Sequence, residues 1–422
     1  MKLPPSLHRR RLALWGGYLV LLILAPMLSS KGYWLSLLSQ IGIMTIFALS
    51  FNMLLGQTGL LSFGHAVYYG LGAFATVHAL RLMNQGALHF PVTLMPLVGG
   101  AAALLFGVAL GSVITRRAGT TFAMISLGIG EMVAASSLMF PAFFGGEGGV
   151  SSNRVVGRGW FGINYGSQTQ MYYLIAGWAF LCILAMYALT QTPLGRMANA
   201  VRDNPERAEF VGYNPQRVRY LMVVLAGFFA GVAGGLTALT YEIVTAETLH
   251  AYTSGLVIMM AFVGGIGFFF GPIIGAALIT VLQIAVAGVT EAWPFYFGLL
   301  FLVIVLYAPG GIAGILVEQK RLWQAGQLRR MAPAYLMAAI PIVLLGCGIV
   351  AVVEMAYRLV NSTQSAALPV RLFGVHLDAT HIPSWVATAA ALALGFLLLR
   401  AVSRRISVHR SAAYAGMQQE RR

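Results

Sequence analysis

The side chains that could make ionic contacts gather in one stretch of the chain, between Gln191 and Arg219. Only 9% of all residues are charged, yet this stretch places arginines, an aspartate and two glutamates between two long apolar runs. Clustered charges of both signs form charge-assisted hydrogen bonds with a complementary surface. We therefore expect this charged segment, residues 191–219, to recognise a partner rather than to carry out a reaction.

The charged segment carries the start and stop signals of a short helix. Asn204-Pro205 and Asn214-Pro215 each combine an N-cap residue with proline at the first helical position. Gly212 is typical of the residue at which a helix ends. These signals predict a two-turn helix over 205–211, about 10 Å long at 1.5 Å per residue.

The residue types that catalysis needs are not arranged for it. The sequence contains no G-x-x-x-x-G-K-[ST] phosphate-binding loop, so any ATP that drives this protein must bind to another chain. The 8 histidines are scattered, with no pair at helical spacing. Cys182 and Cys347 lie far apart in apolar stretches, which predicts neither a disulfide nor a metal site. We expect a chain that is not an enzyme, with no catalytic residue, metal or cofactor.

One carboxylate lies in the middle of an apolar run. Glu131 falls within residues 119–141, where a charge costs roughly 2.5–3.5 kcal/mol on membrane-insertion scales. We expect Glu131 to face the protein interior or water, on the route of a transported molecule or as an anchor between helices. The alternative is that Glu131 lies nearer to the membrane surface than these limits suggest.

Glycines interrupt two apolar runs, from Gly56 to His65 and from Gly264 to Gly275. Each glycine costs a helix roughly 1 kcal/mol relative to alanine. Backbone groups freed by a broken helix are tolerated in a membrane only where they line a cavity or are buried in protein. Paired interruptions indicate a substrate pathway, and tight packing alone is the alternative. The candidate pathway residues are Gly56, Gln57, Gly59, Ser62, Gly64, His65, Glu131, Gly264, Gly265 and Gly267.

The elements that must position these residues are membrane-spanning helices. The chain is 59% hydrophobic, and apolar stretches of about 20 residues, enough for a bilayer core of roughly 30 Å, recur along it. This pattern predicts an all-α polytopic membrane protein with about 10–12 transmembrane helices, glycine-broken segments and a cytoplasmic helix. Spans are expected near 12–30, 33–55, 58–82, 91–115, 119–141, 171–190, 220–241, 252–270, 272–290, 295–317, 333–357 and 382–402.

The orientation follows from the distribution of positive charge. Most of the 27 lysines and arginines lie on the loops that face the same side as the N-terminus, and cytoplasmic loops are enriched in these residues. Both termini and the charged segment are therefore expected in the cytoplasm. Topology also accounts for the net charge of +15, so nucleic-acid binding is not indicated.

Several motifs follow one another in a fixed order: Ser50–Gly59, Leu61–His65, Ser126–Glu131, Gly145–Val150, Leu194–Arg196, Val201–Asn204, Gly264–Gly267, Gly271–Ala276 and Ala308–Ile312. With them, residues 33–317 resemble the membrane permease subunits of branched-chain amino acid ABC importers, the LivM type of the LivH/LivM permease family. The resemblance implies a non-catalytic translocation subunit of the bacterial inner membrane. Its implied partners are a second related permease, two cytosolic ATPase subunits and a periplasmic substrate-binding protein.

In this resemblance the charged segment corresponds to the family's cytoplasmic coupling loop. Glu206 and Glu209 stand at its acidic positions and Gly212 at its glycine position. Ala208 and Val211, three residues apart, are expected to form the apolar contact with the ATPase. The residues expected to couple to the ATPase are Arg202, Asp203, Glu206, Arg207, Ala208, Glu209, Val211 and Gly212.

The chain is expected to have four parts. They are an N-terminal tail and first helix (1–32), a permease core containing the coupling loop (33–317), a basic cytoplasmic linker (318–332) and an extension with two further helices and a basic tail (333–422). Two alternatives to an amino acid importer remain open. One is an ion-coupled carrier that uses Glu131, and the other is the same importer class moving urea, short amides or aromatic acids.

Overall fold

The computed structural model describes residues 5–28, 32–155, 164–324, 328–361, 370–372, 375–377 and 381–419. A helix lies at every span expected from the sequence, and the all-α fold class is confirmed. The long helices are α1 (Pro5–Leu24), α2 (Gly32–Thr58), α3 (His65–Asn84), α4 (Met95–Ile114), α5 (Thr120–Met139), α7 (Gln168–Gln191), α10 (Pro215–Tyr241), α11 (Ala251–Gly264), α12 (Gly271–Ala287), α13 (Trp293–Tyr307), α14 (Gly311–Gln324), α15 (Leu328–Asn361) and α16 (Ile382–Gln419).

Short elements connect these helices. The α-helical ones are α6 (Pro141–Phe144), α8 (Pro193–Asp203) and α9 (Pro205–Phe210). The 3-10 turns are η1 (Ala25–Leu28), η2 (Val92–Leu94), η3 (Gly146–Gly148) and η4 (Ala246–Leu249). Two antiparallel strand pairs are formed, β1 (Val150–Ser151) with β2 (Ile243–Val244) and β3 (Val370–Leu372) with β4 (Val375–Leu377).

Not every helix is long enough to cross a membrane alone. Among the described residues, seven helices have the necessary length and apolar character, or up to eight if α13 and α14, bent by 45° at their junction, form one span. Shorter apolar helices lie at Trp15–Met27, Ala251–Gly264 and Gly271–Ala287. The last two are short because the glycine-rich residues 265–270 separate them.

The chain folds as two compact units. The first contains residues 1–285 and 301–314, and the second contains residues 286–300 and 315–422. In the second unit α15 and α16 pack along each other, with Gly348 against Leu392. The hydroxyl of Tyr296 donates to Glu354 (3.0 Å) and that of Tyr357 to Glu291 (2.7 Å). These bonds tie α15 to the start of α13.

In the first unit α10 packs against α2, α3 and α4. Small residues allow this close approach: a Cβ atom added at Gly72 of α3 would lie 2.5 Å from Gly231 Cα of α10. Gly227 and Gly235, one helical turn to either side of Gly231, also touch neighbouring helices. This seam is the small-residue packing typical of membrane helices, and it holds the core that carries the glycine breaks.

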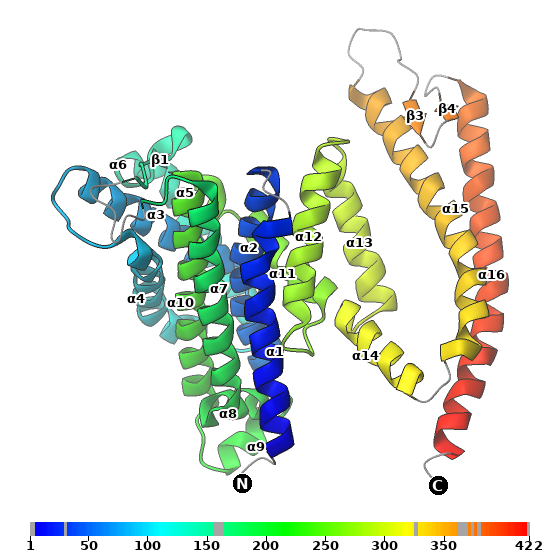
Figure 1. The fold of residues 1–422 in the computed structure, drawn as a ribbon, viewed down its shortest axis with the longest axis horizontal. Helices are drawn as coiled ribbons and strands as arrows, with labels where there is room; N and C mark the ends of the chain where they lie inside the picture. The colour runs from blue at the N-terminus through cyan, green and yellow to red at the C-terminus, as the bar shows by residue number, and fades with distance from the viewer. Residues whose placement is uncertain are drawn as a thin grey trace. The chain divides into compact units, whose positions relative to one another are not determined.

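The two ends of the first unit differ. One end carries α6 and the β1–β2 pair, and the opposite end carries α8 and α9 (Figure 1). The first helix, α1, begins at the α8–α9 end (Figure 1). At the β1–β2 end, Arg154 donates to the carbonyl oxygens of Leu239 and Thr240, the last turn of α10, where a positive charge complements the helix dipole.

We predict that Gly231→Ala destabilises the first unit by about 1–3 kcal/mol, because the added methyl group forces α10 away from α4. Gly177→Ala is the control: Gly177 lies in α7 with open space where a Cβ would be, and alanine favours a helix by about 0.5–1 kcal/mol over glycine. Melting temperatures of the purified proteins in detergent should fall for the first variant only. Equal melting temperatures for both variants would contradict the packing seam.

Candidate functional site

The charged segment forms two helices rather than one. α9 spans Pro205–Phe210, one residue shorter than expected, and α8 precedes it over Pro193–Asp203. α8 was not predicted, although Thr192-Pro193 carries the same cap-and-proline signal. The side-chain oxygens of Thr192, Asn204 and Asn214 each accept a hydrogen bond from the backbone N–H three residues later, at 3.3, 2.9 and 3.1 Å.

The apolar contact surface of α9 is not the one that the sequence predicted. Ala208 is only 5% exposed and packs into the chain, so it is not available to a partner. Phe210 is 90% exposed and Val211 70% exposed. The helix ends at Phe210, and Val211 is its C-cap residue. Phe210 and Val211 form an exposed apolar tip, beside the exposed Glu206, Arg207 and Glu209.

The other helix of the segment, α8, is anchored to the core. It buries Gly195, Ala198 and Val201, which share one face. Arg202, near its end, donates a hydrogen bond from Nη1 to the backbone carbonyl of Gly56 in α2. Its guanidinium also pairs with the exposed Asp203 at 2.9 Å. The charged segment is therefore linked directly to the first glycine-rich region.

The first glycine-rich region is a break between two helices. α2 ends at Thr58, residues 59–64 form the first break, and α3 begins at His65. Gly59 has φ +72°, a left-handed conformation that ends α2, and its N–H bonds to the Leu55 carbonyl at 3.1 Å. The expected interruption of the helix is confirmed at this position.

The second glycine-rich region forms a similar break, residues 265–270, between α11 and α12. Gly265 has φ +111°. A Cβ atom at Gly56 would lie 2.9 Å from the carbonyl oxygen of Ile266. The end of α2, just before the first break, is therefore in contact with the second break, although the two are far apart in the sequence.

Serines from two other helices pair with the backbone around the first break. Ser126 of α5 accepts from the Phe63 N–H at 3.1 Å, and Ser254 of α11 accepts from the Ala66 N–H at 2.9 Å. The first N–H groups of a helix have no partner within it, so these serines satisfy the start of α3. Gly64 also packs against the backbone of Ser126. The first break is thus held between α5 and α11.

Some buried polar atoms near the first break are left without partners. His65 is fully buried between aromatic rings, and its Nε2 lies 2.9 Å from Ser50 Oγ. Within the described residues, His65 Nδ1, Asn52 Oδ1 and Gln57 Oε1 have no hydrogen-bond partner. Each such group costs about 1–3 kcal/mol.

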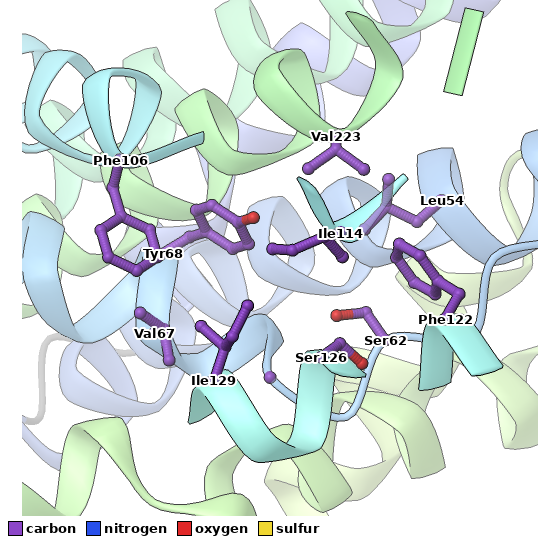
Figure 2. Close-up of a pocket in the computed structure, with 11 residues that line it drawn as sticks. Leu54, Ser62, Val67, Tyr68, Phe106, Ile114, Phe122, Ser126, Ile129 and Val223 are labelled. Carbon is purple, nitrogen blue, oxygen red and sulfur yellow. The ribbon is translucent and has the colours of Figure 1, made fainter. Parts of the chain in front are cut away.

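A small cavity lies beside the first break (Figure 2). Its volume is about 10 Å³, which is room for about one water molecule and far below the roughly 300–1,000 Å³ of ordinary small-molecule pockets. Figure 2 shows Ser62 and Ser126 next to each other at its edge, among apolar side chains. In this conformation the cavity is too small to hold a metabolite.

The candidate pathway residues fall into two groups. Those buried around the two breaks are Gly56, Gln57, Ser62, Gly64, His65, Gly264 and Gly265. Gly59, Gly267 and Glu131 are exposed. Of the two surroundings expected for Glu131, the protein interior and water, the interior of this chain is therefore not the one observed.

Glu131 lies on the outer face of α5 with Met124, Leu127, Gly128 and Ala135, which are also exposed. We call this face the α5 stripe. A carboxylate in a spanning helix is costly against lipid. The α5 stripe therefore suits contact with water or with another protein chain. No group of three or more His, Cys, Asp or Glu side chains in the described part of the chain could hold a metal ion.

Interrupted helices inside a polytopic membrane protein are typical of transport proteins. The family model "branched-chain amino acid transport system / permease component" matches residues 33–309. The chain belongs to this family.

Individual relatives agree with this assignment. The chain is similar to the high-affinity branched-chain amino acid transport system permease protein LivM of Salmonella typhimurium, at 26% identity over 74% of this chain and 76% of the relative. LivM of Escherichia coli is also 26% identical, over 72% and 75%. The galactose/methyl galactoside import permease protein MglC of Salmonella typhimurium is 26% identical over 69% of this chain and 93% of the relative. No solved structure matches the chain.

We predict that Ser254→Ala weakens the start of α3, because it leaves the buried Ala66 N–H without a partner, at a cost of about 1–3 kcal/mol. Hydrogen–deuterium exchange of peptides covering residues 63–69 measures the effect, and exchange there should be faster in the variant. Unchanged exchange in Ser254→Ala would show that this hydrogen bond does not hold the break.

The control for this prediction is Ser136→Ala in α5. The Ser136 hydroxyl donates to the Met132 carbonyl of its own helix at 2.7 Å, so its removal leaves no N–H group unpaired. We expect this variant to change stability by less than about 0.5 kcal/mol and to leave exchange at residues 63–69 as it is in the unmodified protein.

Proposed function

We propose that this chain is the translocation subunit of an ATP-driven importer for branched-chain or related hydrophobic amino acids. The single observation that carries the proposal is the exposed tip of α9, Phe210 and Val211, on a permease chain that has no phosphate-binding loop. Aromatic anchors of this kind dominate the binding energy of protein interfaces. The partner that binds the tip is an ATPase subunit, which performs the ATP hydrolysis.

The coupling surface consists of the tip and the charges around it. Phe210 and Val211 enter a groove of the ATPase, and Glu206, Arg207 and Glu209 form polar contacts at its rim. Asp203 and Gly212 flank these contacts, and both are exposed. Apolar residues at the centre with charges at the rim are the usual anatomy of an interface.

The α8–α9 end also indicates how the protein is oriented in the membrane. The α8–α9 end lies in the cytoplasm, and both termini lie on that side. This is supported by the excess of Lys and Arg on that side in the sequence and by the start of α1 at the α8–α9 end (Figure 1). The opposite end, with β1 and β2, faces the periplasm and the substrate-binding protein. The protein is a multi-pass protein of the bacterial inner membrane.

The substrate pathway runs along the α5 stripe, between this chain and a second permease subunit. Two observations support this route: the cavity beside the first break is too small for an amino acid, and Glu131 is exposed on a membrane helix. The Phe63–Gly64 turn of the first break packs against Ser126 and Gly130 on the buried face of α5, the helix that carries Glu131. A carboxylate there favours a substrate with an ammonium group over a neutral sugar.

The whole importer tests this proposal. We expect that proteoliposomes containing this chain, its partner permease, the ATPase subunits and the binding protein take up leucine only when ATP is supplied. Other amino acids, urea and short amides are tested in competition. Uptake by this chain alone, driven by an ion gradient without ATP, would show an ion-coupled carrier instead.

We predict that Phe210→Ala combined with Val211→Ala lowers the affinity for the ATPase by at least about tenfold, as loss of an interface anchor does. The expected result is loss of the ATPase subunit during purification on the tagged permease, with normal membrane insertion. Phe140→Ala is the control, because Phe140 is also exposed but follows α5. Full retention of the ATPase by the double variant would rule out the tip as the contact.

A further inference from the structure

The contact between Arg202 and Gly56 joins the charged segment to the first break. We propose that Arg202 is a positioning residue that transmits movement of α8 and α9 to the end of α2. This inference rests on the proposed function, since it concerns how ATPase closure reaches the transport pathway. It assigns Arg202 an inward role, distinct from that of the exposed tip at Phe210 and Val211.

The Gly56 carbonyl needs a partner from outside its own helix. In a continuing helix the Leu60 N–H would bond to this carbonyl, but that N–H instead bonds to the Leu54 carbonyl at 3.0 Å. The last carbonyls of a helix also carry the negative end of its dipole. The Arg202 guanidinium supplies both a donor and a positive charge, so the contact is a charge-assisted hydrogen bond.

A second contact fixes the same arginine to the turn. A Cβ atom at Gly59 would lie 3.0 Å from Arg202 Cγ, so the arginine stem rests on the turn that ends α2. The guanidinium is oriented from the other side by Asp203, whose Oδ1 accepts from both Nε and Nη2 at 2.9 Å. A planar fork can serve both partners at once, whereas a lysine ammonium cannot reproduce this geometry.

The contacts continue from Gly56 towards the proposed pathway. Gly56 touches the Ile266 carbonyl of the second break. The first break then leads to Phe63, which is bonded to Ser126 of α5. A displacement of α8 through Arg202 therefore acts where both breaks and α5 come together. A chain of packed groups couples two sites only if displacing one site displaces the other. For α8 and the first break, this can be tested.

The test uses the complete importer in proteoliposomes with three variants. Arg202→Gln removes the charge and the fork. Arg202→Lys keeps the charge. Arg217→Gln is the matched control, because Arg217 is exposed in the same charged segment and lies outside the coupling contacts proposed above. The measured quantities are retention of the ATPase subunits, basal ATP hydrolysis and the number of substrate molecules transported per ATP.

For Arg202→Gln we expect retained ATPase subunits, unchanged basal hydrolysis and about a tenfold fall in transport per ATP, from the loss of one charge-assisted hydrogen bond. Arg202→Lys should recover part of this loss, and Arg217→Gln should match the unmodified protein. If the Arg202→Gln variant does not insert into the membrane, the Arg202→Lys variant tests the proposal instead. Its transport per ATP should still lie below that of Arg217→Gln. Transport per ATP equal to that of the control overturns the proposal.

Hydrogen–deuterium exchange separates this inference from the proposed function. In the purified chain, amides of residues 55–64 should exchange faster in Arg202→Gln than in Arg217→Gln. This readout does not require ATP-driven transport, so an unmodified importer that fails to transport counts against the proposed function alone. Faster exchange together with normal transport per ATP would reduce Arg202 to a structural helix cap and overturn its positioning role.

Discussion

The structure depends on one constraint: a backbone N–H or carbonyl released from a helix in apolar surroundings must find another partner. α2 stops at Thr58 and α3 starts at His65, so the groups freed between them must be paired from elsewhere in the chain. Ser126, Ser254 and Arg202 supply those partners from three different helices. Because of this requirement, several helices pack together at the point where α2 and α3 are interrupted.

Close glycine packing makes the junction compact. Gly56 meets the second break and Gly64 meets α5 with no room for a side chain, and the cavity beside the first break is the size of a water molecule. A dense interior moves as rigid bodies rather than deforming gradually. This suits a permease in which helices shift as units and the substrate takes the route proposed here along the outer face of α5.

The positions of the helices could be predicted from the sequence, because the signals that set them act between residues close together in the chain. Apolar stretches located the helices, and Asn204-Pro205 located α9, because both signals act over a few residues. The inward direction of Ala208 could not be read, since it depends on where α9 packs. The exposure of Glu131 and the contact of Gly56 with Ile266 depend on tertiary packing between distant parts of the chain. A single sequence records that glycines lie in both regions, but not that Gly56 meets the second break.

The central claim is that the tip of α9 is the point at which an ATPase acts on this chain. The most direct measurement is photo-crosslinking in intact cells, with a photoreactive amino acid in place of Phe210 and, separately, of Phe140. We expect a covalent product with the cytosolic ATPase subunit from position 210 and none from position 140. An ATPase product from position 140, or none from position 210 in a transporting protein, would contradict it.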